Sequence, residues 1–107
     1  MSIENFTGVY RAYYDEEKNI LKSEVFMVNG KKEGMYNSYY KNGQICEEVN
    51  YIDDKKNGNY KSYYENGQLM LEVNCIDNKM NGIYKSYHLN GGLLTKVNYF
   101  NGVYNKK

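Results

Sequence analysis

The side chains that most often carry catalysis or bind metals are few in this 107-residue chain. His88 is the only histidine, and an imidazole could titrate near neutral pH. Cys46 and Cys75 are the only cysteines, and no second histidine joins them in a zinc-binding or triad pattern. The acidic pair Asp53-Asp54 lacks the regular ligand spacing and the terminal glutamate of a calcium-binding loop. The sequence therefore predicts a chain that is not an enzyme and that uses no cofactor or metal ion.

Tyrosine gives the stronger signal, and that signal is for binding. The chain holds 14 tyrosines, and one of them recurs at the same position in each of four similar segments, beside basic side chains. Tyrosine and arginine are enriched in protein interfaces because they bury a large area at a modest entropic cost. The candidate partner-binding residues are Tyr13, Tyr39, Tyr63 and Tyr87, which we call the tyrosine row, with Arg11, Lys61 and Lys85. The alternative interpretation is that these rings only support a sheet by packing on neighbours such as Met70 and Leu94.

Four copies of one segment carry these side chains. Two copies read GMYNSYYKNGQICEEVNYIDDKKN from Gly34 and GNYKSYYENGQLMLEVNCIDNKMN from Gly58. A third copy starts at Gly82, and a longer one starts at Gly8. A fixed period of this size is typical of an array in which each unit covers its neighbour. We expect a single repeat domain over residues 1–107, with units at 8–33, 34–57, 58–81 and 82–104 and a C-terminal cap.

Each unit predicts one β-hairpin. Asn66-Gly67 separates two strand-like segments, and an Asn-Gly pair is the strongest local signal for a two-residue type I′ turn. We expect longer polar connections, such as residues 53–58, to join one hairpin to the next. The predicted facing pairs include Tyr60 with Val73, Lys61 with Glu72, and Tyr63 with Met70. The expected fold is all-β: a single elongated, twisted antiparallel meander of stacked β-hairpins, with no helix.

This register predicts two different faces. Tyrosine, valine and leucine fill one face, while the tyrosine row and the basic residues occupy the other. The same alternation sends Cys46 and Cys75 to opposite faces, so we expect two reduced thiols in apolar positions rather than a disulfide. Because a single sheet cannot leave an apolar face in water, we expect it to curl or to pair with another surface.

Composition excludes several classes of protein. A net charge of +1 argues against a dedicated nucleic-acid binder. The start MSIENF lacks a charged region followed by an apolar stretch, so we expect no signal peptide. No run approaches the roughly 20 apolar residues that a membrane-spanning helix needs. Mean hydropathy is −0.85. We expect a soluble, cytoplasmic protein.

The repeat resembles the membrane occupation and recognition nexus (MORN) repeat. The resemblance lies in the spacing of Tyr60, Tyr64, Asn66-Gly67 and Asn81-Gly82. The unit that begins at Gly58 is similar to the MORN variant of the YwqK family of bacterial antitoxins, and the likeness covers roughly residues 8–104.

This resemblance implies a curved stack of hairpins that binds another protein. In YwqK-like proteins the implied partner is a toxin, which the antitoxin or immunity protein neutralises by direct binding. MORN arrays of eukaryotes and large viruses imply two alternatives. One is a scaffold that self-associates into a homo-oligomer, and the other is an anionic-lipid binder in which Lys61 and Lys85 meet the head groups.

Overall fold

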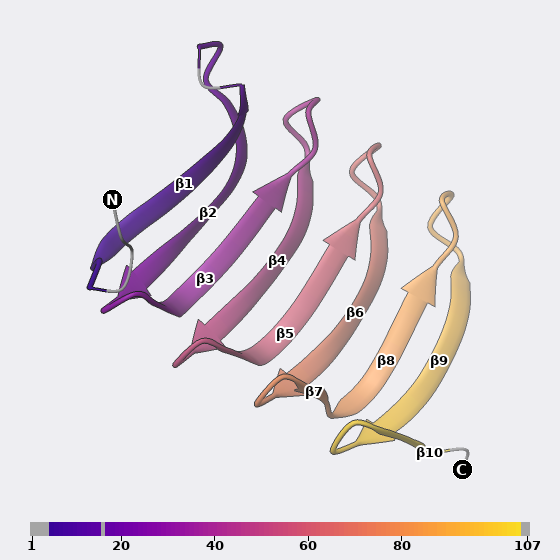
Figure 1. Cartoon of the computed structure of the whole chain (residues 1–107). Helices are drawn as coiled ribbons and strands as arrows, with labels where there is room; N and C mark the ends of the chain where they lie inside the picture. The colour runs from indigo at the N-terminus through magenta and orange to yellow at the C-terminus, as the bar shows by residue number, and fades with distance from the viewer. Residues whose placement is uncertain (1–4, 16, 106–107) are drawn as a thin grey trace.

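In a computed structural model, which describes residues 5–15 and 17–105, the chain forms one antiparallel sheet (Figure 1). The ten strands are β1 (Gly8–Asp15), β2 (Ile20–Val28), β3 (Lys31–Tyr39), β4 (Ile45–Ile52), β5 (Lys55–Tyr63), β6 (Leu69–Ile76), β7 (Lys79–Met80), β8 (Gly82–Tyr87), β9 (Leu93–Phe100) and β10 (Val103–Asn105). Strand order follows chain order, except that both β7 and β8 pair with β6. The described ranges contain no helix, and hence none that could cross a membrane. The predicted fold class is confirmed.

The sheet is a single thin layer that measures 49 × 30 × 13 Å. Its strands are bowed, and β1 and β10 lie at opposite ends (Figure 1). One face, which we call the core face, carries the buried side chains. These are Val25, Met27, Ser38, Val49, Tyr51, Ser62, Val73 and Cys75.

Long side chains of the sheet itself shield the core face. The ring of Tyr36 meets the ring of Tyr51 edge-on, with the centroids 6.0 Å apart. The ammonium group of Lys32 lies 4.9 Å from the centre of the Tyr51 ring, where the ring quadrupole attracts a cation. The lysine stem covers apolar surface while its charge stays near water. This is how one layer buries Val49 to 1% exposure.

The predicted register holds in the middle of each hairpin. Tyr60 faces Val73 and Lys61 faces Glu72, as the alternation of side chains required. Towards the loop the prediction is wrong, because Tyr63 faces Leu69 rather than Met70. A β-bulge inserts one extra residue there, and it recurs in the other units.

The bulge also changes where Cys46 lies. In the hairpin of β3 and β4, Ser38 faces Glu47 while Tyr39 faces Ile45, so Cys46 is the extra residue. Ile45 therefore shares the face of Tyr39, and Cys46, the next residue along β4, lies on the face of Ser38 and Glu47. Cys46 and Cys75 thus share the core face, and the prediction that they leave opposite faces is wrong. Both are free thiols.

The type I′ turns predicted at Asn66-Gly67 and at the equivalent Asn42-Gly43 and Asn90-Gly91 are wrong as well. Tyr40 donates its N–H to Gln44 O at 2.8 Å, and Gly43 donates its N–H to Tyr40 O at 2.9 Å. Of the Asn-Gly pair, only Gly43 has a positive φ, at 88°. This is a three-residue loop, a type I turn followed by a bulge at glycine. Asn42 contributes its side-chain oxygen, which accepts the N–H of Gln44 at 2.8 Å.

The tight type I′ turns lie at the opposite ends of the strands, where a longer connection was predicted over residues 53–58. Both central residues of each turn have positive φ, from 49° to 84°. The turns are Asn29-Gly30, Asp53-Asp54, Asp77-Asn78 and Asn101-Gly102. Strands of consecutive units therefore pair as directly as strands within one hairpin.

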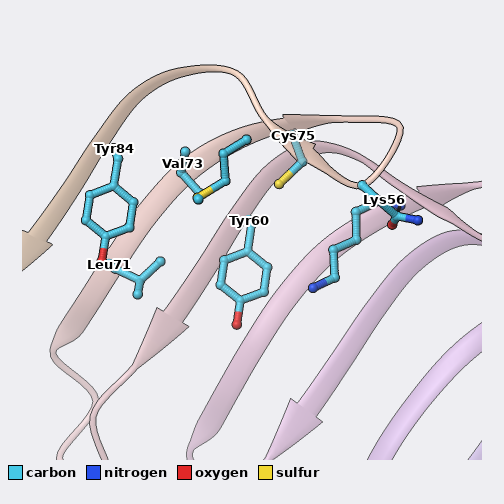
Figure 2. Close-up of a pocket in the computed structure, with 8 residues that line it drawn as sticks. Lys56, Tyr60, Leu71, Val73, Cys75 and Tyr84 are labelled. Atoms are coloured by element: carbon cyan, nitrogen blue, oxygen red, sulfur yellow. Dashed lines mark hydrogen bonds between the residues drawn. The ribbon is translucent and has the colours of Figure 1, made fainter. Parts of the chain in front are cut away.

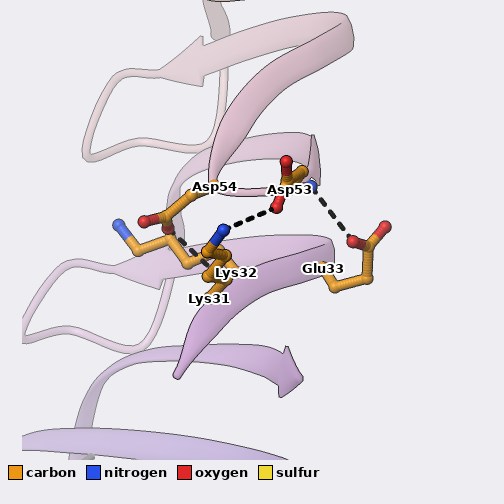
Figure 3. Close-up of polar contacts among 5 residues, drawn as sticks. All are labelled: Lys31, Lys32, Glu33, Asp53 and Asp54. Atoms are coloured by element: carbon orange, nitrogen blue, oxygen red, sulfur yellow. Dashed lines mark hydrogen bonds and ion pairs between the residues drawn. The ribbon is translucent and has the colours of Figure 1, made fainter. Parts of the chain in front are cut away.

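The acidic pair Asp53-Asp54 fastens its turn to the preceding unit (Figure 3). Asp54 donates its N–H to Lys32 O at 2.9 Å, and its carboxylate accepts the N–H of Lys32 at 3.1 Å. Asp53 forms an ion pair with Lys31 at 3.3 Å and donates its N–H to the Glu33 carboxylate at 3.0 Å. Both acidic residues are thus engaged in holding stacked turns together.

Candidate functional site

The tyrosine row lies on the face opposite the core face, which we call the ladder face. Tyr39, Tyr63 and Tyr87 end strands β3, β5 and β8, and Tyr13 lies near the end of β1. All four rings are half-buried. The period-2 alternation of each strand places the row there, together with Arg11, Lys61 and Lys85.

Glutamates of the preceding unit hold two rings of the row, those of Tyr63 and Tyr87. Tyr63 donates its hydroxyl to the Glu48 carboxylate at 2.5 Å, and Tyr87 donates to Glu72 at 3.2 Å. Each bond runs diagonally between neighbouring strands, a distance that a tyrosine spans easily. The pKa of Tyr39 is raised by burial and then by Glu24 and Glu48. The ladder face thus repeats a tyrosine–carboxylate pair from unit to unit.

Tyr63 and Tyr87 are neutral hydrogen-bond donors at physiological pH. Burial, followed by the hydrogen bond to Glu48, raises the pKa of Tyr63 to about 12. Burial and the bond to Glu72 also raise the pKa of Tyr87. A phenol whose pKa is raised gives up its proton less readily, so Tyr63 and Tyr87 are poor nucleophiles. The arrangement is suited to recognition rather than to covalent chemistry.

The basic side chains of the ladder face alternate with acidic ones. Arg11 forms an ion pair with Glu24 at 3.1 Å. Lys61 faces Glu48 on one side and Glu72 on the other. These opposite charges offset one another across the strands. Among the described residues, this alternation interrupts the positive charge of Arg11 and Lys61 on the ladder face.

An exposed apolar stripe also lies on the ladder face. It occupies the last strand position before each type I′ turn, and exposure ranges from 37% to 73%. The apolar stripe consists of Val28, Ile52, Ile76 and Phe100. Near the N-terminal end, Val9, Phe26 and Met35 are also exposed and line a hollow of about 310 Å³ beside Arg11. Contiguous exposed apolar side chains mark interaction surfaces.

Neither the bonds from the tyrosine row to glutamates nor the apolar stripe was predicted from the sequence. A comparison of equivalent slots could have found them, because glutamate recurs at 24, 48 and 72, and an apolar residue recurs before every turn. Both features also share the ladder face by parity. The sequence did not locate the type I′ turns. The position of each turn decides which apolar residue precedes it and stays exposed.

A second hollow, of about 220 Å³, lies on the core face (Figure 2). Its walls include Tyr60, Val73, Cys75 and Tyr84, with Lys56 at one side. The ammonium group of Lys56 lies 4.9 Å from the centre of the Tyr60 ring. Tyr60 donates its hydroxyl to Glu47 on the neighbouring strand. Burial raises the pKa of the Cys75 thiol, which disfavours a reactive thiolate.

His88 is explained by its place at the end of the array. Tyr40 and Tyr64, at the equivalent slot, donate their hydroxyls to the carbonyls of Tyr63 and Tyr87 in the next unit, at 2.5 and 2.7 Å. No further unit follows His88 among residues 17–105. The slot therefore needs no phenol there, and His88 is exposed.

Comparison with known proteins agrees with this repeat geometry. The family model for the MORN repeat variant matches residues 32–53, 56–75 and 80–101. These segments correspond to the hairpins of β3–β4, β5–β6 and β7–β9 and together span more than half of the chain. No curated protein and no solved structure gives a significant match. The chain is a repeat module that belongs to the MORN repeat variant family.

Proposed function

We propose that this protein is a non-enzymatic binding module that holds a folded partner protein on its ladder face. One observation carries the proposal. The tyrosine row, in which glutamates bind Tyr63 and Tyr87, shares the ladder face with an exposed apolar stripe at the other ends of the strands, and no second layer of described residues covers this face. Interfaces between proteins are built from aromatic anchors with apolar surface around them.

The size of the sheet supports a protein partner. A standard protein interface buries roughly 800 Å² on each side. The sheet extends over 49 × 30 Å, which is large enough for such a footprint on one face. Charge supports the same class of partner, because the net charge is +1 and Arg11 and Lys61 of the ladder face are offset by glutamates. Nucleic acids and anionic membranes bind surfaces with excess positive charge.

The tyrosine–glutamate bonds also favour binding by pre-organisation. A ring that is already fixed by Glu48 loses little conformational freedom when a partner covers it. Tyrosine has only two side-chain torsions to begin with, which is why paratopes use it.

The resemblance to YwqK-like proteins supports a narrower form of this function, an antitoxin that holds a toxin inactive. With a net charge of +1, such capture would depend on aromatic and apolar contacts rather than on acidic mimicry of a nucleic acid. The two free thiols fit a reducing compartment such as the cytoplasm. Rescue of cells that express a candidate toxin by co-expression of this protein tests the narrower form.

A substitution on the ladder face tests the general form. The partner is identified by affinity purification, produced separately and titrated against the protein by calorimetry. Replacement of Tyr39, Tyr63 and Tyr87 by alanine together should weaken binding at least 100-fold, about 3 kcal/mol, as expected for aromatic anchors. The matched control replaces the exposed Tyr10 and Tyr104 by alanine and should bind normally. Unchanged binding by the triple variant, with its β-sheet circular dichroism intact, would refute the proposal.

A further inference from the structure

One strand edge at the C-terminal end of the sheet is only partly covered. Strand β10 pairs with Asn98, Tyr99 and Phe100 of β9. Beyond those three pairs, no strand of the described chain pairs with residues 93–97 on that side (Figure 1). Leu93 and Leu94 are 55% and 57% exposed, whereas the equivalent Leu69 and Met70 are half-buried. An open strand edge presents unpaired backbone groups that can accept another strand.

The charge next to this edge differs from the rest of the array. Lys96 occupies the slot that Glu24, Glu48 and Glu72 fill in the other units. Within its own hairpin Lys96 faces Lys85, and like charges directly opposite each other are destabilising. Glu72 faces Lys85 from the other side, but no described acidic residue pairs with Lys96. Lys85 and Lys96 therefore place two adjacent positive charges on the ladder face, next to the open edge.

The earlier units show what strand would fit there. At each junction the incoming strand sets a small side chain opposite the residue before the glutamate, as in Glu47 with Ser62 and Leu71 with Ser86. The incoming strand also sets a tyrosine opposite the valine that comes directly after the glutamate, as in Val49 with Tyr60. The corresponding residues of β9 are Thr95, Lys96 and Val97. In the same register, an added strand would place a small residue opposite Thr95, an acidic residue opposite Lys96 and an aromatic residue opposite Val97.

We propose that the open edge of β9 binds an extended segment of a partner protein, antiparallel to β9, with an acidic residue opposite Lys96. This surface is the edge of the sheet and not the tyrosine row. Binding at this edge can therefore be tested independently of the proposed function.

A second copy of the chain fits this edge poorly. In the same register, β1 of another molecule would set Arg11 opposite Lys96, which repeats the clash of like charges. His88 also lacks the phenol with which Tyr40 and Tyr64 bind the following unit. Both features disfavour head-to-tail growth and leave an acidic segment of a different protein as the occupant.

Two synthetic peptides test the inference on the full chain. The first, Tyr-Glu-Ser-Tyr, is the sequence of residues 84–87 of β8 with glutamate in place of Lys85, and the second is the unchanged Tyr-Lys-Ser-Tyr. Each is titrated to millimolar concentration into the ¹⁵N-labelled protein. Amide shifts should concentrate in residues 93–97. The acidic peptide should bind about two- to thirtyfold more tightly than the basic one, the range expected from exchanging a repulsive cross-strand pair for an attractive one.

A charge reversal supplies the decisive control. In Lys96→Glu the preference should invert, so that the basic peptide binds more tightly, while Lys18→Glu at the far end of the sheet should leave the preference unchanged. Glutamate fills this slot in three other units, so the variant should fold. Shifts in residues 8–15 instead, absence of binding, or a preference that does not invert would overturn the inference. Concentration-dependent oligomers in sedimentation of the protein alone would also overturn it, because they would make a second copy the occupant.

Discussion

The hydroxyl of Tyr63 donates a 2.5 Å hydrogen bond to Glu48, fifteen residues earlier and in the preceding unit. Tyr87 makes the equivalent bond to Glu72. The same bonds therefore join consecutive units and hold the rings that we propose to contact a partner. The side chains that join consecutive units on the ladder face are therefore also the ones that we propose for partner binding.

Replacement of Glu48 by glutamine should lower the pKa of Tyr63 from about 12 towards the ordinary value near 10. The carboxylate favours the neutral phenol, both by accepting its proton in a hydrogen bond and by its negative charge. Burial is the larger cause and persists in the variant, so the fall should be partial. A pH titration of the tyrosine ¹³Cζ resonances measures it, with Tyr63→Phe to assign the signal. An unchanged midpoint for Tyr63 would contradict the bond.

Stability should fall in alkaline solution. Several tyrosines have a pKa above the ordinary 10, with Tyr40 and Tyr63 at about 12, chiefly because they are buried. Between those two pH values the unfolded chain loses phenolic protons that the folded chain keeps, so the free energy of unfolding declines as pH rises. Melting temperatures should be steady up to about pH 9 and should drop between pH 10 and 12. Tyr63→Phe should weaken the dependence, and a flat profile through pH 12 would contradict the prediction.

Removal of one phenolic hydroxyl between units should destabilise the array. Tyr64 donates to the carbonyl of Tyr87 at 2.7 Å, so Tyr64→Phe should lower the free energy of unfolding in urea by about 1 kcal/mol. The reverse change, His88→Tyr, adds a phenol at the equivalent slot of the last hairpin. Within residues 17–105 no later unit follows that hairpin, so the phenol has no carbonyl of a next unit to bind. It should therefore give no comparable gain. Equal effects at the two positions would contradict the assigned role of this slot.

The turn at Asp53-Asp54 can be tested by its chemistry. Asp54 has a φ of 69° and binds the N–H of Lys32, so Asp54→Ala should cost about 1–2 kcal/mol through backbone strain and the lost acceptor. Asp54→Asn should be nearly neutral, because Asn78 fills the same slot and accepts the N–H of Lys56 at 2.8 Å. Urea denaturation of both variants measures the difference. A costly asparagine substitution would show that charge, rather than turn geometry, matters there.

Much of the fold was predictable from the repeat and its period-2 alternation. Tyr60 faces Val73 and Lys61 faces Glu72 because one face must be apolar and charges must pair. The turns were not predictable in the same way. An Asn-Gly pair satisfies both a type I′ turn and a three-residue loop, since each places the glycine at positive φ. Aspartate and asparagine tolerate the left-handed region, so Asp53-Asp54 forms the tight turn instead.

The candidate site was predictable only in part, for a related reason. Equivalent slots identified the tyrosine row, and parity placed it with Lys61. Whether those rings are fixed depended on the diagonal bond from Tyr63 to Glu48, which follows from strand neighbours across units. Strands of successive units pair directly only because the connection between them is a tight turn. Because this tight turn was not predicted, Glu48 was not expected to lie beside the ring of Tyr63.

Charge at the last hairpin gives a further test. Lys96 faces Lys85 on the ladder face, where the other units place glutamate. Lys96→Glu exchanges a repulsive cross-strand pair for an attractive one and should raise the free energy of unfolding by about 1 kcal/mol. Because Lys96 is exposed, 1 M salt should remove most of the gain. Lys18→Glu, also exposed but outside the strands, should change stability little. A gain that survives high salt would point to packing rather than charge, and no gain at all would show that the two lysines already avoid each other at no cost.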